Sequence, residues 1–136
     1  MTEPGEKEDA RRLFTELWAQ IGPAGDPLHR VALAHAMADV QDDPQEELAW
    51  DLRALQAADL VTDQRAAQAG VASPVSGFYP SLYLNLGEDY RKLHDLPAAR
   101  RNLELGRAAA QALGDDGYSM MIKRGLDALA TRLADG

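Results

Sequence analysis

The chain has 136 residues, enough for one domain with a buried core. Apolar residues make up 46% of it but aromatic residues only 6%, and a core built largely from Ala and Leu favours helices over sheets. There is no apolar run long enough to span a bilayer and no signal-type N-terminus, so we expect no membrane span, no secretion and a cytoplasmic location. The absence of cysteine excludes disulfides and thiolate metal sites.

The net charge of −8 is unevenly distributed along the chain. Residues 1–63 contain 14 acidic and 5 basic residues, whereas residues 64–136 contain 8 acidic and 9 basic ones. An acidic surface repels phosphate backbones and anionic lipid head groups, so we expect neither a nucleic-acid nor a membrane partner. Two interpretations of the acidity stay open. It maintains solubility as a solvated surface, or it forms a patch for a basic partner or for the more basic half of a second copy.

After a flexible start at residues 1–5, the spacing of apolar residues predicts an amphipathic helix from Lys7 to Ile21. Its apolar stripe consists of Leu13, Phe14, Leu17, Trp18 and Ile21. A turn rich in Gly and Pro follows. Asp26 as N-cap and Pro27 at the first helical position then begin a second helix, which runs to about Val40.

Asp43 is the expected N-cap of a third helix, which reaches at least Leu60 and carries its stripe at Leu48, Leu52 and Leu55. Residues 27–69 therefore form a helix pair. Trp18 falls on the stripe of the first helix and is expected in the core. Trp50 lies off the leucine line of the third helix, so it either packs against a neighbouring helix or lies partly exposed at a partner surface.

The Gly- and Ser-rich stretch from Thr62 to Tyr79 predicts a loop, centred on residues 70–79, that either takes part in function or merely connects. Residues 80–113 then predict a second helix pair. Gly87 in its first helix and Ala99 in its second are small enough to let two antiparallel helices approach closely. Gly114 is placed to end the pair at a left-handed cap.

The sequence Tyr83-Leu84-Asn85-Leu86-Gly87-Glu88-Asp89-Tyr90, followed by Ala99, Leu103 and Gly106, resembles the tetratricopeptide repeat (TPR). This family has a two-helix unit of about 34 residues with Leu-Gly and then Tyr in the first helix and small residues in the second. The resemblance covers residues 80–113. His94 stands where the family usually has Gly between the helices, and Gln111 stands where it usually has Pro.

The first helix of residues 27–69 aligns with that of this pair at a shift of 53, where Leu33-Ala34 lies over Leu86-Gly87. The second helix aligns only at a shift of 51, so residues 27–69 are interpreted as a degenerate helix pair. A last helix at residues 117–134, capped by Asp116, is expected to cover the open end of the stack. The resemblance therefore implies an all-α fold. Residues 1–136 would form a single TPR-like domain, an α-α superhelix of about six antiparallel helices with a terminal capping helix.

No catalytic motif emerges, because the chain lacks a nucleophile elbow, a cysteine nucleophile and a glycine-rich phosphate loop. We expect a protein that is not an enzyme and has no cofactor and no metal site. The resemblance implies instead a concave groove that binds a peptide or protein segment. The residues implied to line it are His35, Asp39, Leu84, Asn85, Glu88, Arg91 and Lys92.

Two alternatives to peptide binding stay open. The first is a homo-oligomer, a homodimer for example, in which the acidic N-terminal half of one copy meets the basic stretch from Arg91 to Arg107 of another. The second is a sensor or regulatory domain that holds a small ligand between the superhelix and the loop at residues 62–79.

Overall fold

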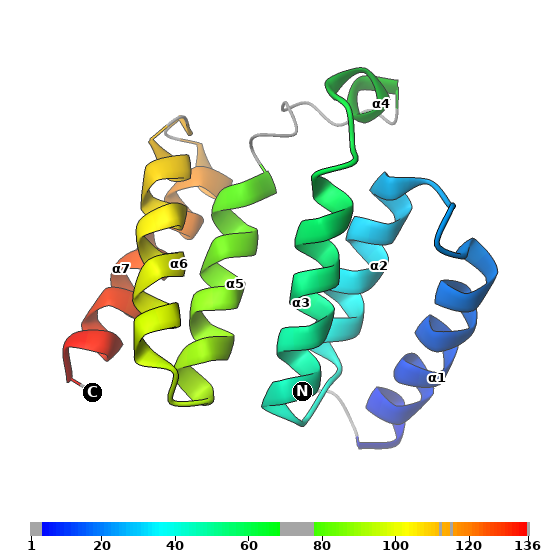
Figure 1. The fold of residues 1–136 in the computed structure, drawn as a ribbon, viewed down its shortest axis with the longest axis horizontal. Helices are drawn as coiled ribbons and strands as arrows, with labels where there is room; N and C mark the ends of the chain where they lie inside the picture. The colour runs from blue at the N-terminus through cyan, green and yellow to red at the C-terminus, as the bar shows by residue number, and fades with distance from the viewer. Residues whose placement is uncertain (1–3, 69–77, 112, 115, 136) are drawn as a thin grey trace. The chain divides into compact units, whose positions relative to one another are not determined.

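The computed structural model describes residues 4–68, 78–111, 113–114 and 116–135, and over these residues the protein is all-α, as expected (Figure 1). The described helices are α1 (Pro4–Ile21), α2 (Pro27–Asp39), α3 (Pro44–Ala58), α4 (Asp63–Gln68), α5 (Tyr79–Lys92), α6 (Leu96–Ala110) and α7 (Gly117–Asp135). There are thus seven helices rather than about six in the described part of the chain. The chain divides into two compact units, Met1–Val61 and Thr62–Gly136.

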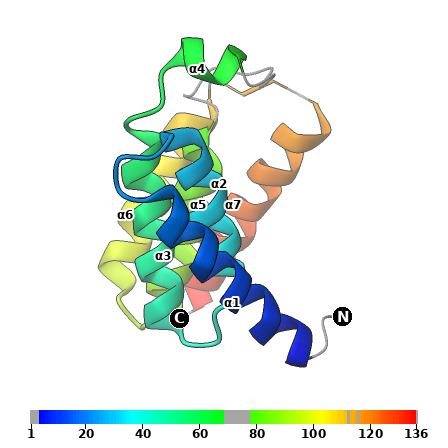
Figure 2. The ribbon, with the colours of Figure 1, turned by 90° about the vertical axis from the view of Figure 1, so that its right-hand side faces the viewer.

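In the first unit, α2 packs along α3 and α1 lies obliquely against α2 (Figure 2). Both predicted N-caps are confirmed, because Asp26 accepts a hydrogen bond from the Leu28 amide and Asp43 accepts one from the Gln45 amide, each 3.0 Å long. Residues 4 and 5, expected in a flexible start, belong to α1. The helix α3 ends at Ala58, two residues before the expected Leu60.

The buried face of α3 differs from the predicted leucine stripe. The residues of this helix with the least exposed surface are Asp51, Ala54, Ala57 and Ala58, whereas the three leucines of the stripe are half-buried. On α2 the buried positions are Leu33, Ala34, Met37 and Ala38. Alanine at such positions shortens the distance at which two helices can pack.

In the second unit, α5 packs along α6, and α7 contacts both helices. Gly87 lies against α6 as predicted, but its tightest contact is with α7. A Cβ atom added to Gly87 would lie 2.6 Å from Cδ2 of Leu129 and 3.5 Å from the carbonyl oxygen of Ala99. The core consists of Ala99, Leu103, Ala110, Ile122, Leu126, Leu129 and Leu133. This core explains why small residues recur on α6.

The connection from α5 to α6 contains His94, whose φ angle is +64°. The His94 amide donates to the Arg91 carbonyl at 3.0 Å and the Asp95 amide donates to the Tyr90 carbonyl at 2.9 Å, the two bonds of a Schellman motif. The position at which the resembled family usually has Gly is therefore in the left-handed region here. The left-handed cap predicted at Gly114 is wrong, because α6 already ends at Ala110 with Gln111 in a right-handed conformation.

Two surface carboxylates have lowered pKa values. A hydrogen bond from Lys7, together with its positive charge, lowers the pKa of Asp42. The backbone N–H of Ser119, which donates to Oδ1 of Asp116 at 2.8 Å, lowers the pKa of Asp116. This bond confirms Asp116 as the cap of α7.

The predicted loop at residues 62–79 contains the short helix α4, which no sequence signal indicated. Residues 69–77, and with them most of the expected loop centre, lie outside the described residues. Among the described helices, none combines the length and the apolar character that crossing a bilayer requires.

Candidate functional site

Two of the predicted groove residues of α5 lie where α7 packs. The side chain of Leu84 contacts Gly125 of α7, since a Cβ atom added to Gly125 would lie 2.6 Å from Cδ2 of Leu84. Glu88 accepts hydrogen bonds from Nε and Nη2 of Arg91, at 3.2 and 3.1 Å, and from Arg132 of α7. The structure thus brings Glu88 and Arg91 together and uses both Leu84 and Glu88 to attach α7.

The exposure of the other predicted residues varies along α5 and α2. Asn85 is half-buried and Lys92 is exposed on α5. His35 and Asp39 lie on the exposed side of α2, where Nε2 of His35 is 3.9 Å from Oδ2 of Asp39. This pair belongs to the first unit, whereas the α5 residues belong to the second.

The exposed face of α6 carries a concentration of positive charge. Arg100, Arg101 and Arg107 are all exposed on it, with Glu104 as the one acidic residue of this helix. In the described part of the chain, no carboxylate lies within 4.0 Å of Arg100 or Arg101. This is notable in a protein with a net charge of −8, where carboxylates outnumber cations. A face of this kind attracts acidic groups.

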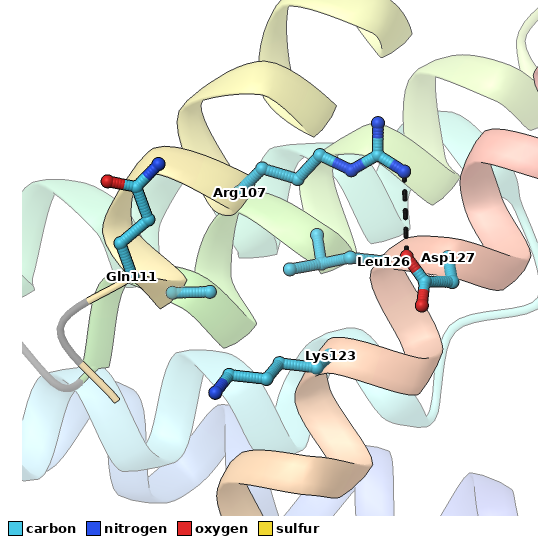
Figure 3. A pocket seen from close by; sticks show the side chains of 6 residues that line it. Arg107, Gln111, Lys123, Leu126 and Asp127 are labelled. Carbon is cyan, nitrogen blue, oxygen red and sulfur yellow. Dashed lines mark ion pairs between the residues drawn. The ribbon is translucent and has the colours of Figure 1, made fainter. Parts of the chain in front are cut away.

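A pocket of about 280 Å³ lies between α6 and α7, next to this face (Figure 3). The residues that line it are Arg107, Ala110, Gln111, Lys123, Leu126 and Asp127. Ala110 and Leu126 are buried and form an apolar floor. In Figure 3, the side chains of Arg107 and Lys123 extend on opposite sides of Leu126.

One ion pair and one hydrogen bond hold the two cations of the pocket loosely. Nη2 of Arg107 lies 3.5 Å from Oδ1 of Asp127, and both side chains are largely exposed, so solvent screens this pair. Nζ of Lys123 donates to the carbonyl oxygen of Gly114 at 3.2 Å. A guanidinium has five N–H donors and an ammonium has three, so both groups keep donors for a ligand. The pocket thus suits a carboxylate carried on a short apolar stem.

The sequence draws attention to the α6 side of this pocket but not to its α7 side. Arg107 belongs to the basic stretch from Arg91 to Arg107 that the sequence singled out. Lys123 and Asp127 lie on α7, and their approach to α6 depends on how α7 is rotated about its axis. No local signal fixes that rotation. The apolar spacing of Ile122, Leu126 and Leu129 indicates only that the face of α7 that carries these residues lies toward the core.

Comparisons of the chain with protein-family models, with curated proteins and with solved structures found no match. The TPR-like character of residues 80–113 therefore stays a resemblance in sequence.

Proposed function

We propose that this protein is a non-enzymatic interaction module, and that its second unit binds an acidic segment of a partner protein along α6 and in the pocket between α6 and α7. The observation that carries the proposal is the exposed basic face of α6 beside an apolar-floored pocket with a cation on each side. Charge of this sign in an acidic chain favours acidic partners and raises their rate of association.

The pocket suggests how one residue of the segment is held. The methylene groups of a Glu side chain would cover Ala110 and Leu126, and its carboxylate would lie between Arg107 and Lys123. Gln111, at the end of α6, would donate to or accept from the backbone of the segment. Arg100 and Arg101 would pair with further acidic residues along the helix.

We also propose a TPR-like superhelical architecture, supported by the helix pairs α2–α3 and α5–α6 and by α7 covering the second pair. In such an architecture the first helix of a pair lines a groove. Asn85, Arg91 and Lys92 of α5, and His35 and Asp39 of α2, are then further contact positions for a partner segment. Arg91 would act with part of its donor set already bound to Glu88.

A peptide titration tests the binding proposal. A labelled acidic peptide with alternating Glu and Leu is titrated with the protein, and fluorescence anisotropy is measured at low and high salt. We expect binding that weakens with salt. The affinity of the double variant Arg107→Gln/Lys123→Gln should be at least about tenfold lower, because two charge-assisted hydrogen bonds are lost.

The matched control is Arg124→Gln, which removes a cation from an exposed position of α7 that does not line the pocket. It should bind like the wild type, with equal helicity by circular dichroism in all three proteins. Equal affinity of the pocket double variant and the wild type would overturn the proposal, as would affinity that is insensitive to salt.

Self-association is a second candidate, favoured by the opposite charges of residues 1–63 and of the α6 face. It predicts a sedimentation coefficient that rises with protein concentration at low salt and falls when salt is added. Arg100→Glu/Arg101→Glu should keep the protein monomeric. A sedimentation coefficient independent of concentration would exclude this candidate.

A further inference from the structure

The five basic residues of the first 63 positions differ in their partners. Nζ of Lys7 and Nη2 of Arg11 lie 2.5 and 3.4 Å from the carboxylate of Asp42, and Nη1 of Arg12 lies 3.8 Å from Asp9. Of the five, only Arg30 and Arg53 have no carboxylate within 4.0 Å among the residues that the structure describes. This holds although the same 63 positions contain 14 acidic residues.

Both unpaired arginines lie on tryptophan rings instead. The guanidinium carbon of Arg30 is 4.1 Å from the ring centroid of Trp18, and that of Arg53 is 4.3 Å from the ring centroid of Trp50. The two rings pack edge to face, with centroids 5.0 Å apart and an interplanar angle of 85°. These four side chains, contributed by α1, α2 and α3, are called the Trp–Arg stack below.

A pocket of about 300 Å³ lies beside the Trp–Arg stack, where α1 ends, α2 begins and α3 ends. It is lined by Trp18, Pro23, Arg30, Arg53, Gln56, Ala57 and Leu60, all within the first unit. Arg30 also donates to the carbonyl oxygen of Gly22, in the turn after α1, which positions its guanidinium at the pocket. The lining thus combines two cations, one amide and apolar surface.

We propose that this pocket binds a carboxylate joined to a flat apolar group. Guanidinium groups pair with carboxylates through two parallel N–H donors, and within the described ranges no carboxylate pairs with Arg30 or Arg53. The apolar part of the ligand would pack on Trp18, Pro23 and Leu60. The pocket volume is at the lower end of the range for small-molecule sites, which fits one ring and a short acid chain.

Residues 1–63 carry nine more acidic than basic residues, so attraction of an anion to this site is confined to the immediate surroundings of Arg30 and Arg53. The site belongs to the first unit and is independent of the binding site proposed for α6 and α7.

Tryptophan fluorescence reports on this site directly, because the two tryptophans of the chain are both in the Trp–Arg stack. The first probe is 3-phenylpropionate, which does not absorb where tryptophan is excited selectively. We expect a saturable change in emission with a Kd on the order of 1 mM. The neutral 3-phenylpropanamide should give no change, and isothermal titration calorimetry repeats the comparison without relying on fluorescence.

A carboxylate of this kind could belong to a free acid or to a protein segment. The peptide acetyl-Phe-Glu-amide, with acetyl-Phe-Gln-amide as its neutral match, distinguishes these sources. Binding of phenylpropionate alone assigns the pocket to a free acid, and binding of the Glu peptide opens it to a protein segment. Either result supports the site, whereas no binding of either carboxylate overturns it.

Arg53→Gln is the decisive variant, since Arg53 is exposed and, among the residues that the structure describes, interacts with Trp50 alone. It should weaken carboxylate binding at least about tenfold by removing a charge-assisted hydrogen bond. Arg12→Gln removes the same charge from an exposed position of α1 outside the pocket and should bind like the wild type. Equal weakening by both variants would refute the site and leave a general effect of charge, as would equal affinity for the acid and its amide.

Discussion

The left-handed conformation of His94 leads to a quantitative prediction about stability. Its φ is +64°, and no other non-glycine residue in the described ranges has a positive φ. Its side chain is exposed, so little burial offsets the unfavourable conformation. An L-residue in this region costs about 1–2 kcal/mol relative to a right-handed one. Glycine avoids that cost but loses about 0.5–1 kcal/mol more conformational entropy on folding.

The balance of these terms predicts that His94→Gly raises the free energy of unfolding by about 0.5–1 kcal/mol. The two hydrogen bonds of the Schellman motif use backbone atoms only, so the substitution retains them. The corresponding rise in Tm of a unit of this size is about 2–8 °C. Urea denaturation followed by circular dichroism measures the change in free energy.

His94→Ala is the matched control, because alanine removes the imidazole but keeps the Cβ atom that is unfavourable at positive φ. It should leave the free energy of unfolding within about 0.5 kcal/mol of the wild type. Equal stabilisation by Ala and Gly would refute the reasoning, since the gain would then come from loss of the imidazole. Destabilisation by Gly would refute it as well.

Three further substitutions or conditions test the packing, the caps and the charges. Ala99→Leu should lower the free energy of unfolding, measured in urea, by about 2–3 kcal/mol, because Ala99 is fully buried at the contact of α6 with α5. The control Ala108→Leu, on the exposed side of α6, should lower it by less than about 0.5 kcal/mol. Asp26→Ala should cost about 1 kcal/mol in the same assay by removing the N-cap of α2. The pKa values of Asp42 and Asp116 are lower in the folded state, so their stabilising effect is present at neutral pH and is lost as the pH falls below about 4. The urea midpoint of the wild type should therefore drop over that pH window. The midpoint of the double variant Asp42→Asn/Asp116→Asn should drop less steeply.

The helices other than α4, and the N-caps of α2, α3 and α7, could be predicted because their signals are local. An Asp followed by Pro begins α2 and α3, and the hydrogen bond that makes each cap spans two residues. Gly87 and Ala99 were predictable for a related reason, since their spacing within a repeat-like pattern fixes which faces of α5 and α6 meet.

Features that depend on tertiary packing were missed. The basic stretch from Arg91 to Arg107 can be recognised in the sequence, but the shared pocket of Arg107 and Lys123 depends on the rotation of α7. The leucines of α3 have the periodicity of a core stripe, yet Ala54 and Ala58 are the fully buried residues. Apolar periodicity marks a range of directions, and close helix packing then selects the smallest side chains within it.

The Trp–Arg stack shows the same limit at the level of a site. The apolar stripe predicts Trp18 in the core, whereas the structure has it half-buried, and for Trp50 the sequence allows either packing or exposure. In the structure, Trp50 packs against the neighbouring helix α1, where its ring contacts that of Trp18. The sequence shows five cations among 14 acidic residues but cannot show which two have no carboxylate within 4.0 Å in the described part of the structure.

The way an arginine is held decides whether it can also bind a ligand. Arg91 and Arg132 both donate to the carboxylate of Glu88, so their charge is partly neutralised and some of their donors are used. Arg53 contacts the face of Trp50 instead. A ring face holds a guanidinium through its π surface and leaves the N–H groups along the guanidinium edge available. An unneutralised charge with available donors, beside a pocket in an acidic unit, is therefore better suited to recognising a carboxylate than to stabilising the fold.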